Sequence, residues 1–303
     1  MNQLPTLGFI GLGAMGQPMA TCLINAGYPV LGNDLNPQRM KMFAGLHGDR
    51  SVSSLNAMGP KIDILIMILP NSQVSTAVLL GPDGVAQFMK PGSLVIDMTS
   101  GVPSVTQSLN SALNKIGVDL IDAPVSGAVA RAENGTLTIM AGGTDHLIDR
   151  ACPILEAMGS VTRTGILGSG HAMKSLNNLV SCAGFLIGIE ALIIGSKFGL
   201  NPEAMVDVLN ASTGMNNSTK KKFKQYVLSD TFDTGFPLKM MLKDIQIALS
   251  LAHELKVPVP FSQLCLDLWA GTEKLLGPDV DHTAMAKGIE QLTGWTIPRT
   301  AKA

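Results

Sequence analysis

The sequence predicts an α/β domain with a doubly wound sheet, followed by an all-α domain. Three observations carry this prediction. The chain of 303 residues is long for a single hydrophobic core, which favours two domains. Short apolar runs alternate with helical segments up to about Thr164, the pattern of strands joined by crossover helices. From Gly170 onward the segments are long and helical, without a strand pattern among them. We therefore expect domains at residues 1–164 and 165–303.

The apolar runs of the first domain are typical of buried strands. Ile62–Pro70 (IDILIMILP) is continuous, as expected for a strand covered on both faces. The expected strands are residues 7–11, 28–33, 62–70, 93–100, 118–127 and 135–143. A helix over residues 15–26 ends at Gly27, and Asn36-Pro37 opens another, with the asparagine as N-cap.

The second domain is predicted to be a set of helices joined by loops. Its first helix is long enough to join the two domains. The apolar part of that helix, Leu179–Gly195, is interrupted by Glu190 before it reaches the roughly 20 residues that a membrane span requires, so we expect a core helix. The expected helices are residues 171–198, 202–210, 238–255, 261–276 and 283–292.

Composition points to small-molecule chemistry in a reducing compartment. The chain has 22 basic and 23 acidic residues and a net charge of -1, which gives no basic surface for nucleic acid or an anionic membrane. The four cysteines lie far apart, without a C-x-x-C pair, so we expect free thiols and a cytoplasmic location. The five histidines are scattered, and no metal site is predicted.

A glycine-rich turn follows the first expected strand. In GFIGLGAMG, Gly11, Gly13 and Gly16 have the spacing G-x-G-x-x-G. The first glycine permits a tight turn, the second lets a pyrophosphate approach the backbone, and the third allows the helix to pack closely on the strand. The phosphates would lie at the helix N-terminus, which predicts a Rossmann-like cofactor site that also includes Ala14 and Met15.

The identity of the cofactor is predicted from Asp34, at the end of the second expected strand. Its carboxylate is placed to accept hydrogen bonds from the adenosine ribose hydroxyls and would repel a phosphate on that ribose. Positions 35 and 36 hold no arginine that could bind such a phosphate. We therefore predict NAD in preference to NADP.

Four segments together resemble the signatures of the β-hydroxyacid dehydrogenase family. They are GFIGLGAMGQPMA, DAPVSGAVARAENGTLTIMAGG, GSGHAMKSLNN and LKDIQIA, and they occur in the expected order over essentially the whole chain. The resemblance implies an NAD-dependent oxidoreductase that transfers a hydride between the nicotinamide and a small β-hydroxy acid of the 3-hydroxyisobutyrate type. Reduction of tartronate semialdehyde or glyoxylate and oxidation of a threonate-like acid are alternatives.

The resemblance makes Lys174, in HAMKSLNN, the catalytic lysine. Its position in the sequence supports this role, because it comes early in a strongly apolar helix, where a lysine is costly unless its charge is used. An amine beside a nicotinamide can exchange the hydroxyl proton near neutral pH. Asn177 and Asn178 follow at three and four residues and reach the same face. Either could orient the lysine and bind substrate; we favour Asn178.

The resemblance also implies how the substrate and cofactor are held. The Ser126 hydroxyl and the backbone N–H groups near Gly127 and Ala128 would bind the substrate carboxylate, with Asp122 structural. Lys243, in the family's Lys-Asp pair, would add positive charge near the cofactor or the substrate anion. Turns beside the nicotinamide and its ribose would contain Met67, Leu69, Pro70 and Thr99.

Several properties stay open at the level of sequence. The segment Ala211–Phe223 is where the substrate loop of the second domain is expected, and Asn216 and Asn217 there could bind extra hydroxyls of a glycerate or threonate. The same fold could carry a non-catalytic dinucleotide-binding scaffold, which would be marked by loss of the lysine, or an imine reductase, which usually has another residue at that position. The long apolar helices indicate a homodimer or homotetramer. The physiological direction of the reaction is undetermined.

Overall fold

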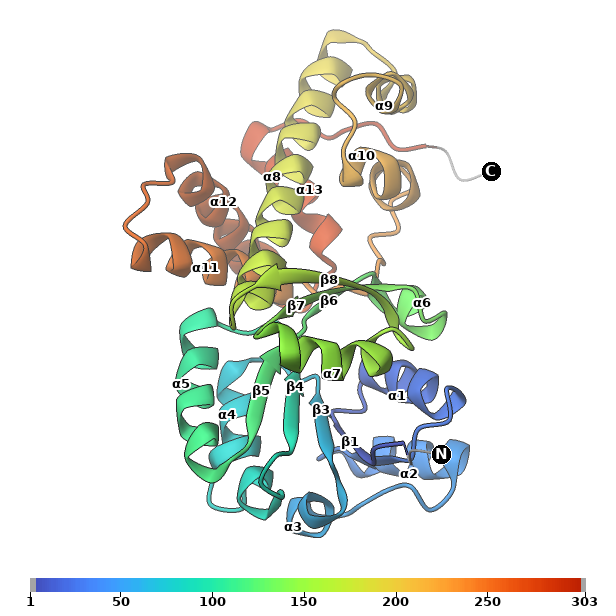
Figure 1. Ribbon diagram of the computed structural model, residues 1–303. Helices are drawn as coiled ribbons and strands as arrows, with labels where there is room; N and C mark the ends of the chain where they lie inside the picture. Colours follow the sequence, from blue (N-terminus) through green and yellow to red (C-terminus); the bar gives the residue numbers. More distant parts are fainter. Residues whose placement is uncertain (1–3, 301–303) are drawn as a thin grey trace. The chain divides into compact units, whose positions relative to one another are not determined.

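The computed structural model describes residues 4–300 (Figure 1). The chain divides into two compact units between Lys174 and Ser175. The sequence placed a boundary between residues 164 and 165, where the last strand of the first unit ends. The structural division falls inside the following helix instead, because the first turn of that helix is bonded to the N-terminal unit, as described below.

The N-terminal unit is built on one mixed sheet in the order β2-β1-β3-β4-β5-β7-β6, with β8 paired to β7. Strands β1 to β5 are parallel, as predicted. Strand β7 runs antiparallel to β5 and β6. The strands are β1 Leu7–Ile10, β2 Val30–Asn33, β3 Ile64–Met67, β4 Leu94–Asp97, β5 Asp119–Asp122, β6 Val125–Ser126, β7 Leu137–Gly142 and β8 Gly159–Gly165.

The helices cover both faces of this sheet, which is why its central strands are apolar without interruption. Alternate side chains of β3 enter different cores: Ile64 and Ile66 pack with residues of α1 and α7, whereas Leu65 and Met67 pack with residues of α3, α4 and α5. Asn36 caps α2 through a bond from the Gln38 N–H, as predicted. The helices are α1 Gly16–Asn25, α2 Pro37–His47, α3 Leu55–Met58, α4 Ser72–Leu80, α5 Pro103–Leu113, α6 Ala128–Glu133 and α7 Asp145–Leu155.

Strand β8 was not predicted. It contains a single aliphatic residue, Val161, and its residues are exposed or partly exposed. It pairs with β7 alone. A polar strand at a sheet margin lacks the apolar run that marks the other strands in the sequence.

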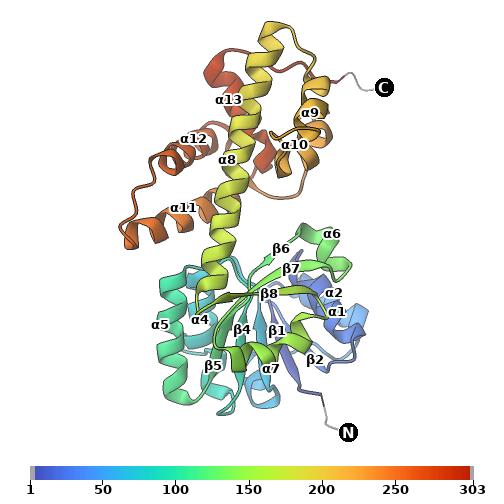
Figure 2. The same cartoon turned by 45° about the horizontal axis from the view of Figure 1, so that its top comes forward.

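The C-terminal unit is helical, and its described residues hold no strand beyond an isolated bridge between Pro237 and Asp281. Within this unit α9 and α10 lie on one side of α8, and α11 and α12 on the other (Figure 2). The elements are α8 Ser169–Phe198, α9 Pro202–Asn210, α10 Asn217–Lys221, a π-helical turn η4 Phe223–Leu228, α11 Leu238–Glu254, α12 Pro260–Leu276, η5 His282–Ala284 and α13 Met285–Thr293.

Helix α8 has the length and composition of a membrane span. One face of it nevertheless belongs to the core of the C-terminal unit, where Phe185, Ile189 and Leu192 are buried among residues of α11, α12 and α13. This packing confirms the expected core helix.

Candidate active site

The glycine-rich turn has the backbone geometry that its three glycines predict. Gly11 has a φ of +98°, and a Cβ there would overlap the Ile68 carbonyl oxygen at the end of β3. A Cβ on Gly16 would overlap the Gly11 carbonyl oxygen, so α1 can start this close to β1 only without a side chain. A Cβ on Gly13 would meet nothing nearer than the Arg39 guanidinium at 3.5 Å. The backbone at Gly13 is therefore open to a ligand.

A cavity of about 550 Å³ lies beside this turn. It is bounded by the turn, by α1 and by α2. Among residues 4–300 no side chain caps the N-terminus of α1, so its first N–H groups suit an anion such as a pyrophosphate. The lining residues are Leu12, Gly13, Ala14, Gln17, Pro18, Thr21, Arg39, Met42 and Glu133. The open glycine backbone and the uncapped start of α1 beside this cavity fit the pyrophosphate of a dinucleotide.

Asp34 is tied to the glycine-rich turn. Its Oδ2 accepts a bond from the Leu12 N–H at 2.8 Å, and its Oδ1 accepts one from the Asn36 N–H at 2.8 Å. Arg39, in the first turn of α2, contacts Oδ2 through Nη1 at 3.4 Å. The Asp34 side chain is 7% exposed and that of Arg39 48% exposed, so the cation is the accessible member of the pair. The sequence prediction considered only positions 35 and 36 and missed Arg39.

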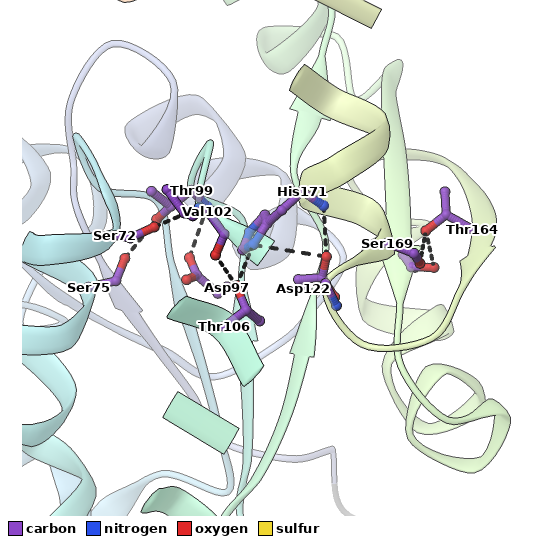
Figure 3. A network of polar contacts seen from close by, with 12 residues as sticks. Ser72, Ser75, Asp97, Thr99, Val102, Thr106, Asp122, Thr164, Ser169 and His171 are labelled. Atoms are coloured by element: carbon purple, nitrogen blue, oxygen red, sulfur yellow. Dashed lines mark hydrogen bonds and ion pairs between the residues drawn. The ribbon is translucent and has the colours of Figure 1, made fainter. Parts of the chain in front are cut away.

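The ends of β3 and β4 are joined by side chains predicted for the cofactor site. The Leu69 N–H donates to Thr99 Oγ1 at 3.0 Å. The Thr99 N–H donates to Asp97 Oδ1 at 3.0 Å (Figure 3). Burial raises the pKa of the Asp97 carboxyl. Met67 is buried at the end of β3, while Pro70 is exposed. The structure thus brings Leu69 and Thr99 together at one edge of the sheet.

The turn after β6 has an unusual backbone. Ser126 ends the strand, Gly127 has a φ of +145°, and Ala128 has a φ of +57°, in the left-handed region. An alanine is rarely found there, because its Cβ crowds the backbone. Ser126 and Gly127 are partly buried, and Ala128 is exposed. Such strain is characteristic of ligand-binding turns.

Asp122, the last residue of β5, anchors the start of α8. Its Oδ1 accepts from the Gly168 N–H at 2.7 Å. Its Oδ2 accepts from the His171 N–H at 2.8 Å (Figure 3). These bonds satisfy N–H groups at the helix start that have no partner within the helix. The His171 ring adds a contact between its Nδ1 and Thr106 Oγ1 at 2.8 Å. Lys174 follows on the next turn, so its backbone position is determined from β5.

In the C-terminal unit, Asn178 and the Lys-Asp pair are in contact. The Asn178 amide is 7% exposed and donates from Nδ2 to Asp244 Oδ2 at 2.5 Å. Its Oδ1 accepts from Asn177 Nδ2 at 3.1 Å. Lys243 Nζ lies 3.4 Å from Asp244 Oδ1. Of the two asparagines, Asn178 is therefore the buried one that a second helix orients.

The two asparagines of the expected substrate loop lie at the start of α10. Asn216 is the N-cap of α10: its Oδ1 accepts from the Ser218 and Thr219 N–H groups, and its Nδ2 donates to the Gly184 carbonyl at 3.2 Å. These bonds account for Asn216 as a structural residue. Asn217 is exposed in the first turn of α10.

The same segment contains a residue that the sequence did not single out. Lys222 is partly buried, and its Nζ lies 3.4 Å from Ser181 Oγ on α8. In the sequence it ends the run Lys220-Lys221-Lys222, which is typical of an exposed surface, so no local signal distinguished it.

Comparison with known proteins covers nearly the whole chain. Residues 6–168 match a family model described as the NAD binding domain of 6-phosphogluconate dehydrogenase. Residues 168–289 match the NAD-binding model of NADP-dependent 3-hydroxyisobutyrate dehydrogenase.

Individual relatives agree with these matches. The chain is 34% identical over 299 residues to 2-(hydroxymethyl)glutarate dehydrogenase from Eubacterium barkeri, covering 98% of this chain and 99% of that protein. It is 31% identical over 287 residues to 2-hydroxy-3-oxopropionate reductase from Escherichia coli, covering 94% and 97%. A solved structure of Mycobacterium tuberculosis 3-hydroxyisobutyrate dehydrogenase with L-serine has a TM-score of 0.87 at 27% identity, covering 95% of this chain and 99% of that one.

Proposed function

The chain belongs to the β-hydroxyacid dehydrogenase family, and from this premise we propose that it interconverts a small β-hydroxy acid and its aldehyde or ketone, with Lys174 as the general acid and base. The observation that carries the proposal is the position of Lys174. It lies one turn after the helix start that Asp122 anchors and one turn before the buried Asn178.

The chemistry assigned to Lys174 is proton transfer. In oxidation its neutral amine takes the proton of the substrate hydroxyl as the C–H pair leaves as hydride; in reduction its ammonium returns that proton. A bound nicotinamide supplies the acceptor or donor of the hydride. Lys174 is partly buried on a largely apolar helix, which supports a role for its amine in proton transfer rather than in solvation of the surface.

Asn178 is proposed as the amide that aligns the substrate. One of its Nδ2–H groups is bonded to Asp244, which leaves the second for the substrate hydroxyl or carboxylate. The Ser126 hydroxyl and the N–H groups of the strained turn at Gly127 and Ala128 are proposed to hold the carboxylate. Fixing the carboxylate would hold the carbinol carbon for hydride transfer.

We also propose that the enzyme prefers NAD to NADP. The support is Asp34, whose carboxylate is bonded to the Leu12 N–H at the cofactor turn and would repel a ribose phosphate. Arg39 opposes this preference, because its guanidinium is partly exposed beside the same cavity. Its pairing with Asp34 at 3.4 Å offsets part of its charge.

The function is tested by following NAD(H) absorbance with purified protein over a panel of substrates. The panel contains 3-hydroxyisobutyrate, 2-(hydroxymethyl)glutarate and threonate for oxidation, and glyoxylate, tartronate semialdehyde and a cyclic imine for reduction. We expect turnover of hydroxy acids and loss of at least 99% of it in Lys174→Ala, with NADH binding retained. A protein that binds NADH but turns over nothing would be the scaffold alternative, and turnover of the imine alone would overturn the assignment.

A self-associated state in the cytoplasm is proposed as well. Large apolar side chains on one side of α8 are exposed in the single chain, and a second copy would cover them. They are Val180, Ile187, Ile194 and Phe198. Light scattering after gel filtration should give a dimer or tetramer mass.

The four cysteines are free thiols, which supports a reducing compartment that cell fractionation can test.

A further inference from the structure

Lys222 carries a charge for which the structure provides no close counter-ion. It follows α10 and precedes the π-helical turn η4. Its Nζ contacts Ser181 Oγ at 3.4 Å and lies 5.9 Å from the centroid of the Phe185 ring. Within residues 4–300 no carboxylate oxygen lies within 4.0 Å of it. A partly buried ammonium in this position is costly unless a ligand brings the missing negative charge.

Asp281, the acid whose charge acts on Lys222 at longer range, already accepts hydrogen bonds from other residues. Asp281 Oδ1 accepts from the Thr283 hydroxyl and N–H, and its Oδ2 accepts from the Thr234 hydroxyl. Asp281 therefore raises the pKa of Lys222 only through space, while burial lowers it to about 8. At neutral pH the group is still mainly an ammonium and can bind an anion.

The contact with Ser181 places this ammonium next to the catalytic face of α8. Lys174, Asn178 and Ser181 follow one another at intervals of four and three residues, so they share one side of the helix. Ser181 lies about 10 Å along the helix axis from Lys174, at 1.5 Å per residue. A substrate aligned by Asn178 and extended along this side of α8 would bring its far end to Ser181 and Lys222.

We propose that Lys222 and Ser181 bind a second carboxylate of the substrate, so that the enzyme acts on β-hydroxy acids that carry a distal carboxylate. This inference rests on the proposed function and deepens it. Asn216, which the sequence offered for a polyhydroxylated substrate, is used in capping α10 and in bonding Gly184. The local chemistry therefore suits a terminal anion rather than a chain of hydroxyl groups.

The test compares two substrates that differ in the distal carboxylate. The kcat/KM of the wild-type holoenzyme is measured for 2-(hydroxymethyl)glutarate and for 3-hydroxyisobutyrate, and then in Lys222→Met and Lys222→Arg. We expect the wild type to prefer the dicarboxylate at least tenfold. Lys222→Met should lose this preference through a rise in the KM for the dicarboxylate alone, and Lys222→Arg should keep most of it.

Lys221→Met is the matched control, because it removes the same charge from an exposed neighbour on α10. This variant should leave the kcat/KM for both substrates unchanged. Binding of glutarate to the NADH complex, measured by calorimetry, gives a readout that does not depend on turnover, and Lys222→Met should weaken it at least tenfold. Equal efficiency of the wild type on both substrates, equal losses on both in Lys222→Met, or unchanged glutarate binding would overturn the inference while leaving the proposed function standing. Failure of every hydroxy acid as a substrate would instead overturn the proposed function.

Discussion

Asn178 and Asp244 form a buried hydrogen bond of 2.5 Å across 66 residues of sequence. The bond joins α8 to α11 and determines which atoms of the Asn178 amide are left for a ligand. Asp244 is 2% exposed, so its removal would leave the amide without its charged acceptor in a place that water hardly reaches. In the proposed function, Asp244 would therefore act on the reaction through Asn178, as a positioning residue.

We expect Asp244→Ala to lower kcat/KM about 10- to 100-fold, because a hydrogen bond to a charged group contributes roughly 1.5–3 kcal/mol. Steady-state kinetics of Asp244→Ala, Asn178→Ala and the double variant form the appropriate cycle. The double variant should be no slower than Asn178→Ala alone, since the acid acts only through the amide. Losses that simply multiply would show that the two residues act independently.

Gly13→Ala should separate cofactor binding from folding. A Cβ at this position meets only Arg39 at 3.5 Å, an ordinary contact, so the melting temperature should change by no more than about 2 °C. The Kd for NADH should nevertheless rise at least tenfold, because the methyl group would occupy the approach to the backbone. Fluorescence titration measures this binding.

Gly16→Ala is the contrasting variant at the same turn. Its Cβ would overlap the Gly11 carbonyl oxygen, so α1 would have to move away from β1 and the melting temperature should fall clearly. If Gly13→Ala bound NADH as tightly as the wild type, the turn would not be the pyrophosphate site.

The proposed preference for NAD should respond in opposite directions to the removal of each member of the Asp34–Arg39 pair. Asp34→Ala removes the carboxylate and should lower the ratio of kcat/KM for NAD to that for NADP at least tenfold. Arg39→Ala removes the neighbouring cation and should raise that ratio by a few fold, a modest effect because the guanidinium is half exposed. An unchanged ratio in Asp34→Ala would exclude this carboxylate as the determinant.

The stability of the protein should depend on pH through Lys222. Burial lowers the pKa of its ammonium from 10.5 to about 8, against the opposing effects of Asp281 and Cys182, and the neighbouring His282 is itself held largely neutral, with a pKa of about 4. Between about pH 8 and 10.5 the unfolded chain therefore binds more protons at this residue than the folded chain. Lys222 therefore lowers the stability of the folded protein at pH 7. This destabilisation decreases as the pH rises through the window, so the free energy of unfolding should increase there.

Urea denaturation at pH 7 and at pH 9.5 measures this effect. Lys222→Met should be more stable than the wild type at pH 7, and its advantage should shrink at pH 9.5. Lys221→Met should have the same free energy of unfolding as the wild type at both pH values. An advantage of Lys222→Met that does not change with pH would mean that the ammonium is not held in a desolvated state.

Features that depend on neighbouring residues in the chain could be read from the sequence. The glycine spacing at residues 11–16, the N-cap at Asn36 and the uninterrupted apolar strands are each encoded within a short segment, because backbone conformation and burial on both faces impose local patterns. The acid at Asp34 belongs to the same group, since the β1-α1-β2 unit has a nearly constant length. These features were sufficient to predict the fold and the class of cofactor from the sequence.

Tertiary structure alone decided which polar groups meet. Asp122 reaches α8 across 46 residues, Asn178 reaches Asp244 across 66, and Lys222 reaches Ser181 across 41. The sequence marked Asp122 and Asn178 as candidates but did not indicate their partners, and the run of three lysines gave no sign that Lys222 differs from its neighbours. Their roles come from desolvation and from the partner that packing supplies, and both are properties of the folded chain rather than of its local sequence.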